Sequence, residues 1–452
     1  MKKSLLAVAA MTAFAGAAQA QSSVTVYGIL DVGFVGGNTT AATAASNTTG
    51  APGVTKATGN QFGNSAEQTS RLGFKGTEDL GGGLSALFTA EFALAPTDTT
   101  LSGNPASTSS TGGASNGGLQ NRQSFVGLKK VGVGTGAIGT QYTGIHNAVA
   151  ATDPGQVNNM MGNVIYASGT GPATNSITTA QGATTAYTVR LDNQLSFVSD
   201  KFAGFGVNAM YVLNNKNSNQ YNLATATAVT STTVNSVAAG TVQGGTVNTT
   251  AWGLGADYTW KNAYITGQYQ SLKQFTTGAV AAPQAFNLAG AGLVTLTPVL
   301  AGSSAATGVA GTPITQGQNV TDNQGYVGAT YDFGILKAYA QYVTRTVTAQ
   351  SNSGIYIKRS AEQIGVRSFI TPTIEAWGSA GLGRFNTLST TASSAPTQNF
   401  NAWQLGSNYW LSKRTNLYAI YGGTTSSNAA LPTGAVISSS GQNYAVGVRH
   451  TF

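Results

Sequence analysis

Residues able to act as general bases or metal ligands are few and scattered in this chain. His146 and His450 are the only histidines among 452 residues, and there is no cysteine. A serine hydrolase needs a histidine beside a serine and an orienting carboxylate, and neither histidine has such a sequence context. No group of His, Asp and Glu has the spacing of a metal site. We therefore expect no catalytic residue and no metal ligand, and we predict that the chain is not an enzyme.

The segment Gly134 to Gly139 reads Gly-Thr-Gly-Ala-Ile-Gly, which matches the spacing of a dinucleotide-binding loop. Such a loop opens a helix and is followed by an acidic residue about 20 positions later. Here Thr140, Gln141 and Tyr142 continue an extended pattern instead. We interpret these glycines as turn and strand positions and expect no cofactor.

Basic side chains on alternating segments indicate an electrostatic role. In the segment Ser70–Gly76, Arg71 and Lys75 lie opposite Leu72 and Phe74, because strand side chains alternate between two faces. A cation facing hydrocarbon near the bilayer midplane costs ~2–4 kcal/mol, whereas one facing water costs little. This pattern favours a strand between lipid and water. The alternative is that these charges are solvated in a surface loop.

Arg122 and Arg190 also fall on the polar faces of predicted strands, and Glu91 lies on the polar face of the strand that begins at Leu84. Fixed charges in a narrow channel with low-dielectric walls bias which ions enter. The polar faces are mixed in charge with a basic excess. We therefore predict a water-filled interior with a modest preference for anions.

The end of the chain shows the alternation most clearly. Tyr444, Val446 and Val448 share one face, Arg449 lies on the other, and the chain closes with Phe452. One apolar face and one polar face are typical of a strand in a transmembrane β-barrel, with lipid outside and water inside.

The same alternation recurs along the chain in hairpins. Short connections, such as Trp260–Asn262 and Thr371–Pro372, alternate with long loops rich in Ala, Thr, Ser, Asn and Gly. Short periplasmic turns and long external loops produce this rhythm, and a soluble sandwich has no reason for it. We predict an all-β fold, an antiparallel barrel of about sixteen strands. A polar loop is expected from about residue 36 to Gln68. The strands are expected near residues 23–35, 70–76, 84–94, 122–130, 135–142, 187–198, 205–213, 249–260, 263–275, 323–333, 335–347, 358–370, 373–385, 399–411, 415–425 and 441–452.

Residues 1–20 have the features of a secretory signal peptide. Lys2 and Lys3 precede an apolar run, and Ala18-Gln19-Ala20 matches a cleavage site. The apolar run is shorter than the ~20 residues of a spanning helix, which argues against a retained anchor. We expect residues 21–452 to form the outer-membrane barrel.

Composition argues against several other classes. Only 8% of the residues are charged, against about 25% in ordinary soluble domains. The net charge of +8 is not clustered on any segment, so no nucleic-acid partner is expected. Disorder is the rival interpretation of so many small polar residues, but 18 Tyr and 17 Phe recur inside the alternating segments and argue against it.

Four segments together resemble the general diffusion porins of Gram-negative bacteria, in particular the β-proteobacterial type. They are Ser23–Gly33, Ser70–Leu84, Arg122–Leu128 and Gly447–Phe452, and they occur in family order. The resemblance implies a homotrimer of sixteen-stranded barrels in the outer membrane, whose third external loop folds into the pore. It also implies that Phe452, with Tyr444 in the same strand, is the signal that the outer-membrane assembly machinery reads.

By the same resemblance, residues 143–186 correspond to the constriction loop. Arg71, Lys75 and Arg122 match basic wall positions of the family, and Arg190 resembles a further lumen-facing position. Relatives often carry several acidic residues in this loop, whereas this sequence has only Asp153. The electric field across the constriction is therefore expected to be strongly one-sided, with basic residues on the wall and little opposing negative charge on the loop.

The function expected from these features is passive diffusion of small hydrophilic solutes and ions through a channel surrounded by outer-membrane lipid. A substrate-selective channel is the first alternative, and it would show an aromatic slide and saturable conductance block. A surface-displayed adhesin-type β protein is the second. That class predicts a fixed-period repeat, which the sequence lacks, and it leaves Phe452 unexplained.

Overall fold

The computed structural model describes residues 23–43, 53–97, 120–166, 186–218, 245–276, 319–350, 356–388, 397–426, 429–430 and 436–452. The predicted signal peptide, residues 1–20, lies outside the described residues, as do residues 167–185 of the predicted constriction loop. Within the described ranges, no helix is both long and apolar enough to cross a membrane.

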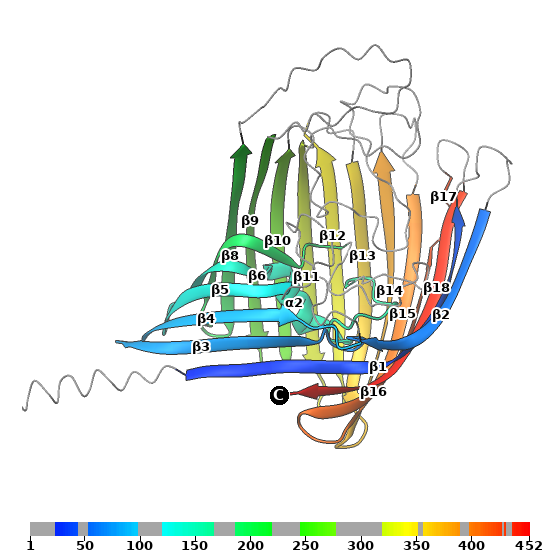
Figure 1. Cartoon of the computed structure of the whole chain (residues 1–452), viewed down its shortest axis with the longest axis horizontal. Coiled ribbons are helices and arrows are strands. Elements are labelled where there is room, and N and C mark those ends of the chain that lie inside the picture. The colour runs from blue at the N-terminus through cyan, green and yellow to red at the C-terminus, as the bar shows by residue number, and fades with distance from the viewer. Residues whose placement is uncertain are drawn as a thin grey trace, which may run out of the picture.

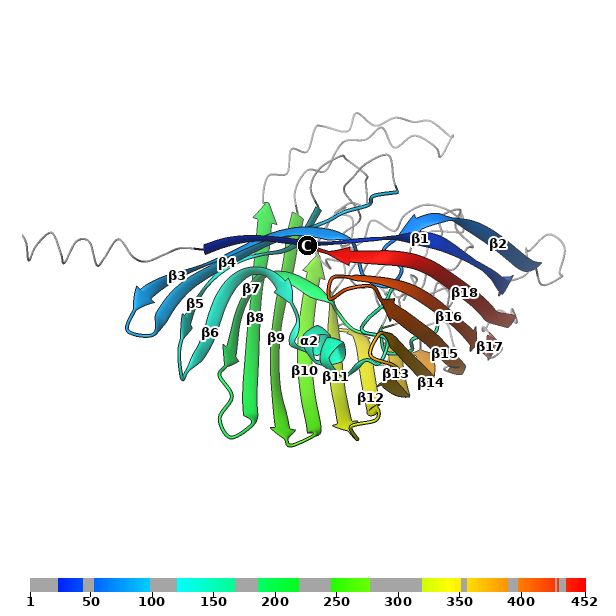
Figure 2. The same cartoon turned by 90° about the horizontal axis from the view of Figure 1, so that it is seen from below.

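The described chain is almost entirely antiparallel strand, with one helix, α2, inside the sheet (Figure 2). The elements are β1 (Ser23–Thr43), β2 (Gly53–Asn64), β3 (Arg71–Gly81), β4 (Leu84–Ala93), β5 (Gln120–Lys130), β6 (Gly134–Tyr142), α2 (Gly144–Thr152), β7 (Arg190–Ser199), β8 (Phe205–Ser218), β9 (Gly245–Trp260), β10 (Ala263–Thr276), β11 (Asn319–Asp332), β12 (Lys337–Ala349), β13 (Tyr356–Phe369), β14 (Ile374–Leu388), β15 (Thr397–Trp410), β16 (Thr415–Ser426), β17 (Ala429–Ala430) and β18 (Val436–Thr451).

The sheet closes on itself, because β1 pairs with β18 along one edge and with β2 and β3 along the other. The strands β2 and β3 run in the same direction along β1 and together fill one position in the wall. The two-residue β17 pairs only with β18, so it adds no position among the described strands. The 18 labelled strands therefore make a closed wall of sixteen positions, which confirms the predicted barrel.

One predicted loop is wrong. The sequence predicted a polar loop from about residue 36 to Gln68, but β1 continues to Thr43 and β2 occupies Gly53–Asn64. These segments pair with each other and β1 also pairs with β18, so their backbone hydrogen bonds are made without an apolar side-chain pattern. A smaller correction concerns β7, which begins at Arg190 rather than at Tyr187.

Side chains alternate across the wall as the sequence predicted. On β1, Val24 and Val26 are exposed on the outer side, whereas Asp31 is completely buried on the inner side. Paired aromatic rings mark the outer surface, such as Trp252 with Tyr269 and Trp403 with Tyr421, at centroid distances of 5.5 and 5.0 Å. Aromatic residues of this kind are enriched at membrane–water interfaces.

The strands of the wall differ in length, and Figure 1 shows β3 to β5 running crosswise to β9–β13. The strands β3 to β7 have 9 to 11 residues, whereas most strands from β8 to β18 have 12 to 16. A tilted strand needs about 9–11 residues to cross a bilayer. The short strands therefore just span the hydrocarbon, and the longer ones extend beyond it on the side of the long connections.

Candidate functional site

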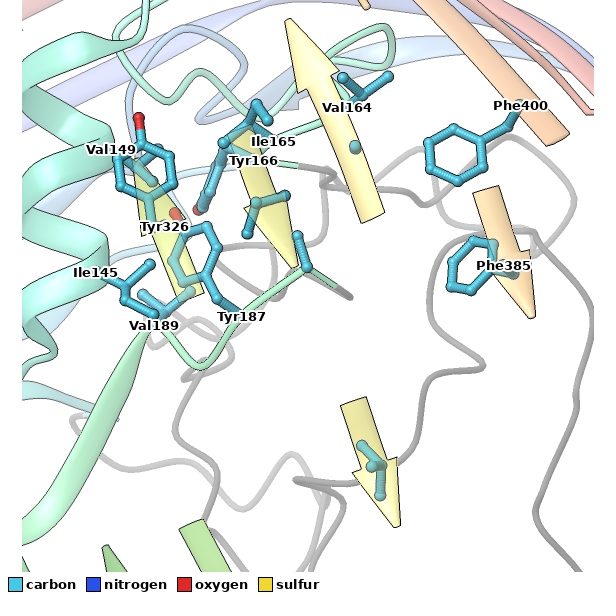
Figure 3. Close-up of a cluster of buried hydrophobic side chains, with 14 of the residues drawn as sticks. Ile145, Val149, Val164, Ile165, Tyr166, Tyr187, Val189, Tyr326, Phe385 and Phe400 are labelled. Carbon is cyan, nitrogen blue, oxygen red and sulfur yellow. The ribbon is translucent and has the colours of Figure 1, made fainter. Parts of the chain in front are cut away.

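The segment after β6 turns into the barrel and forms α2. Thr143 caps this helix, because its hydroxyl accepts a hydrogen bond of 3.2 Å from the backbone N–H of His146. The helix buries Ile145 and Val149 in an apolar cluster, where they meet Tyr326 of β11. Figure 3 shows this cluster, with Tyr187 beside the helix. The helix is thus fixed against the inner wall of the barrel.

After α2, the loop is hydrogen-bonded to the opposite part of the wall. Asn158 donates from its amide to Gln404 of β15 at 3.0 Å, and the backbone N–H of Met161 donates to Asn443 of β18 at 3.2 Å. Val164 donates in the same way to Gln363 of β13 at 3.1 Å. The loop therefore crosses the interior from α2 to the last strand and narrows the space within the barrel.

The loop leaves a cavity of about 290 Å³ against the short-stranded side of the wall. Arg71 of β3, Arg122 of β5 and Arg190 of β7 line the wall side of this cavity. Asn147, Ala150, Gln156 and Tyr166 belong to its loop side, and no carboxylate is among its described lining residues. The structure thus brings together three of the four basic residues selected from the sequence.

One carboxylate, which is not among the described lining residues of the cavity, contacts two of these arginines. Glu91 of β4 accepts a hydrogen bond of 2.7 Å from Nε of Arg122 and lies 3.9 Å from Nη1 of Arg71. Nη2 of Arg122 donates to the hydroxyl of Tyr142 at 2.5 Å. The guanidinium of Arg190 lies over the ring of Tyr142, at 5.4 Å from its centroid. Each guanidinium is therefore held in a defined position by a carboxylate or an aromatic ring.

His146 lines the cavity and is buried in a cluster of aromatic rings. Its ring stacks on Tyr142 with a centroid distance of 4.4 Å, and Nδ1 lies 3.2 Å from the hydroxyl of Tyr187. Burial, followed by the charges of Arg190 and Arg122, lowers the pKa of His146 well below its ordinary value. The imidazole is therefore neutral near pH 7 and adds no charge to the cavity.

Two predicted site residues lie apart from the cavity. Asp153 ends α2, and its carboxylate accepts hydrogen bonds from the backbone of Val157 at 2.7 Å and from Asn163 at 2.8 Å. Burial raises the pKa of Asp153. Lys75 is exposed, with its ammonium 5.3 Å from the ring centroid of Tyr27. Asp153 therefore shapes the loop, and Lys75 lies nearer the short-turn end of β3.

Tyr142 and Tyr166 are site residues that the sequence analysis missed. Both line the cavity. Tyr142 is the last residue of β6, and alternation would place it with the exposed Ile138 on the outer face, but the register shift between Gly139 and Gln141 precedes it and it lines the cavity. Tyr166 belongs to an irregular part of the loop, and no sequence periodicity indicates its position.

The two residues proposed as the assembly signal lie on the closing seam between β1 and β18. Phe452 and Gly28 exchange two backbone hydrogen bonds of 3.1 Å. A side chain at Gly28 would collide with the ring of Phe452, and one at Gly36 would collide with Tyr444. The aromatic rings thus cover two glycines of the first strand.

The model of the Gram-negative porin family matches residues 7–429 of the chain. This protein belongs to that family. The porin is therefore a β-barrel of the outer membrane, and its interior loop and basic wall can be compared with those of related proteins.

Curated relatives match parts of the porin. An outer membrane porin protein of Bordetella pertussis is 32% identical over 236 residues, which cover 51% of this chain and 54% of the relative. The outer membrane porin protein 32 of Delftia acidovorans is 45% identical over 103 residues, 23% of this chain and 25% of the relative. The matched part thus spans about half of the first relative and a quarter of the second.

Solved structures show the same fold at low sequence identity. The anion-selective porin from Comamonas acidovorans superposes with a TM-score of 0.58 at 18% identity, covering 96% of this chain and all of that one. The trimer form of OmpT from Vibrio cholerae superposes with a TM-score of 0.54 at 13% identity, covering 95% and 99%. These similarities bear on the fold of the porin and support the closed barrel.

Proposed function

We propose that this porin forms a water-filled channel through which small hydrophilic solutes and ions diffuse passively, with a modest preference for anions. The observation that carries the proposal is the cavity beside the interior loop. Arg71, Arg122 and Arg190 line it, and no carboxylate is among its described lining residues. The fold likeness to a porin described as anion-selective agrees with this sign of selectivity.

Three features of the site suit anion passage. Protein walls of low dielectric focus the field of fixed charges onto the water between them. Glu91 neutralises part of the positive charge of Arg122 and Arg71. The three arginines therefore attract an anion less strongly than three uncompensated cations would. The contacts of the guanidinium groups with Glu91 and Tyr142 limit their motion. A passing anion therefore meets donors that are already oriented.

The selectivity is tested by the reversal potential of the refolded porin in a planar bilayer under a gradient of potassium chloride. We expect the sign that corresponds to chloride entering more readily than potassium. A potential of the opposite sign would contradict the proposed role of the arginines, and the absence of discrete conductance would contradict the channel itself.

We also propose that the porin is a homotrimer that associates through the outer face of the short strands. Val126, Leu128 and Ile138 are 67%, 54% and 64% exposed on β5 and β6, where the wall is low. A related fold is described as a trimer form. The same proposal includes cleavage of a signal peptide at residue 20 and recognition of Phe452 by the assembly machinery.

A further inference from the structure

Arg359 of β13 is a buried cation on the inner face of the tall side of the barrel, the side that the long strands from β8 to β18 form. Its side chain is 2% exposed. The other end of β13 meets the short turn of residues 370–373. Because short turns of such barrels are periplasmic, Arg359 lies near the external end of the wall. It is not among the described lining residues of the cavity of Arg71, Arg122 and Arg190.

The positive charge of Arg359 has no carboxylate partner among the described residues, whose six ion pairs do not include it. Its direct neighbour across the strand pair, Arg345, is by contrast matched by Asp322. That carboxylate accepts hydrogen bonds of 3.1 Å from Nε of Arg345 and 2.7 Å from Nη2. A buried charge is unfavourable unless it is paired. Arg359 therefore favours an anion beside it.

Within the described chain, one nitrogen of this guanidinium is hydrogen-bonded. Nη2 donates a hydrogen bond of 2.5 Å to the carbonyl oxygen of Val164 in the interior loop. Nε and Nη1 are buried and have no hydrogen-bond partner among the described residues. Either nitrogen can donate to an oxyanion, in a bond that is strengthened by charge on both sides. The contact with Val164 thus fixes the guanidinium while two of its nitrogens stay available.

Aromatic and aliphatic side chains surround this cation. Its Cζ lies 4.9 Å from the ring centroid of Phe400 and 5.6 Å from that of Phe385. The two ring centroids are 5.3 Å apart, and Figure 3 shows both rings on the side of the apolar cluster away from α2. Val347 and Ile357, which pair directly, belong to the same cluster. These surroundings suit a ligand that has an apolar body besides its negative group.

We propose that Arg359 binds a small monocarboxylate with an apolar body, such as an aromatic acid, during its passage through the channel. Nε or Nη1 donates to the carboxylate while Nη2 stays bonded to Val164, and the apolar body packs against Phe385 and Phe400. A single negative charge matches a single uncompensated cation, whereas a second one would lie near Asp322. The proposal deepens the proposed channel function by naming a class of solute, and it rests on that function for access from water.

Two other roles fit Arg359 less well. An inorganic anion such as chloride or phosphate would lose hydration water among phenylalanine and aliphatic side chains that cannot replace it. A role limited to holding Val164 would leave Nε and Nη1 buried without partners, which is unfavourable. An organic carboxylate satisfies the charge, the donors and the apolar side chains together.

The proposal is tested by fluorine NMR of para-fluorobenzoate titrated with the folded, detergent-solubilised porin. We expect a saturable change of its resonance. The neutral para-fluorobenzyl alcohol should bind roughly tenfold more weakly, because a hydrogen bond between charged groups contributes about this factor. Unlabelled benzoate should displace the probe at lower concentration than acetate, which lacks the apolar body, or phthalate, which carries a second charge.

Four variants locate the site. Arg359→Gln should weaken binding of para-fluorobenzoate roughly tenfold, and Arg359→Lys, which keeps the charge, should weaken it less. Lys358→Gln is the matched control, because it removes an exposed cation from the outer face of the same strand. Arg122→Gln removes a cation from the other cavity. Both should bind the probe like the unchanged porin, and discrete conductance steps from each variant verify that it is folded.

Four outcomes would overturn the proposal. Probe binding that survives Arg359→Gln would exclude the contact with this guanidinium. Equal binding of para-fluorobenzyl alcohol would show an apolar site that does not recognise charge, and equal displacement by acetate would exclude the apolar contacts. A loss on Arg122→Gln as large as that on Arg359→Gln would place the carboxylate in the cavity of the three arginines. The absence of conductance steps from the unchanged porin, with its probe binding intact, would instead overturn the channel and leave the carboxylate site supported.

Discussion

The hydroxyl of Tyr418 donates a hydrogen bond of 2.6 Å to the carboxylate of Asp31 inside the closing seam of the barrel. The other oxygen of Asp31 accepts hydrogen bonds from the backbone N–H groups of Glu67 and Gln68, at 2.9 and 2.7 Å. These two residues belong to the segment between β2 and β3, residues 65–70. One buried carboxylate therefore connects β16, β1 and this segment.

The segment between β2 and β3 in turn accepts hydrogen bonds from the interior loop. Asn159 donates from its amide to the carbonyl of Ser65 at 2.7 Å, and its backbone N–H donates to the carbonyl of Ala66 at 3.0 Å. The contacts from Tyr418 through Asp31 to Asn159 are continuous. The position of the loop therefore depends on a residue that does not line the cavity.

We expect Asp31→Ala to destabilise the barrel more than Tyr418→Phe, because it removes three acceptor contacts instead of one donor. The loss of a hydrogen bond to a charged group costs about 1.5–3 kcal/mol, the range expected for Tyr418→Phe. Urea unfolding of the refolded porin measures both changes. Asp31→Ala should also increase the current noise of the open channel, since the segment that contacts the interior loop loses its hydrogen bonds to Asp31. Equal stability of the two variants would contradict this account.

Replacing Arg122 with glutamine should weaken the anion preference. The substitution removes a cation from the cavity wall while Glu91 stays in place, so the local charge becomes less positive. We expect the anion-to-cation permeability ratio to fall roughly two- to fivefold, equivalent to about 0.4–1 kcal/mol. The reversal potential in a salt gradient measures this ratio.

The variant Glu91→Gln should shift the same ratio in the opposite direction, because it removes the compensating carboxylate. Lys75→Gln is the matched control, since Lys75 is a cation on β3 that lies outside the cavity lining. A shift for Lys75→Gln as large as that for Arg122→Gln would show that total charge, rather than the cavity, sets the selectivity.

Selectivity should not change through His146 between pH 7.5 and pH 5.5, a range of about one unit on either side of the ordinary histidine pKa. Burial and the nearby arginines lower the pKa of His146, so the folded porin keeps it neutral in this range. The unfolded chain takes up that proton below its ordinary pKa, so folding stability falls as the pH decreases. We expect the porin and its His146→Gln variant to show the same pH dependence of reversal potential. An acid-induced rise in anion preference that only His146→Gln abolishes would refute the neutral assignment.

Oligomerisation should be sensitive to polar substitution on the short strands. Leu128→Gln places an amide on the apolar face of β5, and we expect it to lower the fraction of trimer in detergent. Leu254→Gln on β9 is the control, because Leu254 is similarly exposed at 59% but lies on the tall side. Size-exclusion chromatography with light scattering measures the mass. Equal dissociation by both variants would argue against an interface on the short strands.

Removal of the terminal ring should impair assembly more than the finished fold. We expect Phe452→Ala to lower the amount of porin in the outer membrane several-fold, while refolding in detergent remains close to normal, because the backbone pairing with Gly28 is unaffected. Phe202→Ala is the control, as Phe202 is 85% exposed in a short turn. An unchanged outer-membrane fraction would exclude Phe452 as the signal.

The fold was predictable from the sequence where lipid and water border the same strand. Residues such as Val24 and Asp31 must face different media, so their alternation reveals both the strand and its orientation. Beyond the hydrocarbon both faces meet water and the constraint disappears. This is why β2, with its polar sequence, was mistaken for a loop.

Alternation places Arg71 opposite Leu72 and Phe74, whereas Arg122 has the parity of the exposed Val126 and Leu128 and faces the interior because the register of β5 shifts beside Glu91. Periodicity places a side chain on a face, but it does not say what lies opposite. Only the tertiary structure brought Tyr166 to the cavity and moved Asp153 away from it, because an irregular loop is positioned by hydrogen bonds to distant strands. The sequence thus determined which side chains face water, and the folded loop decided which of them meet.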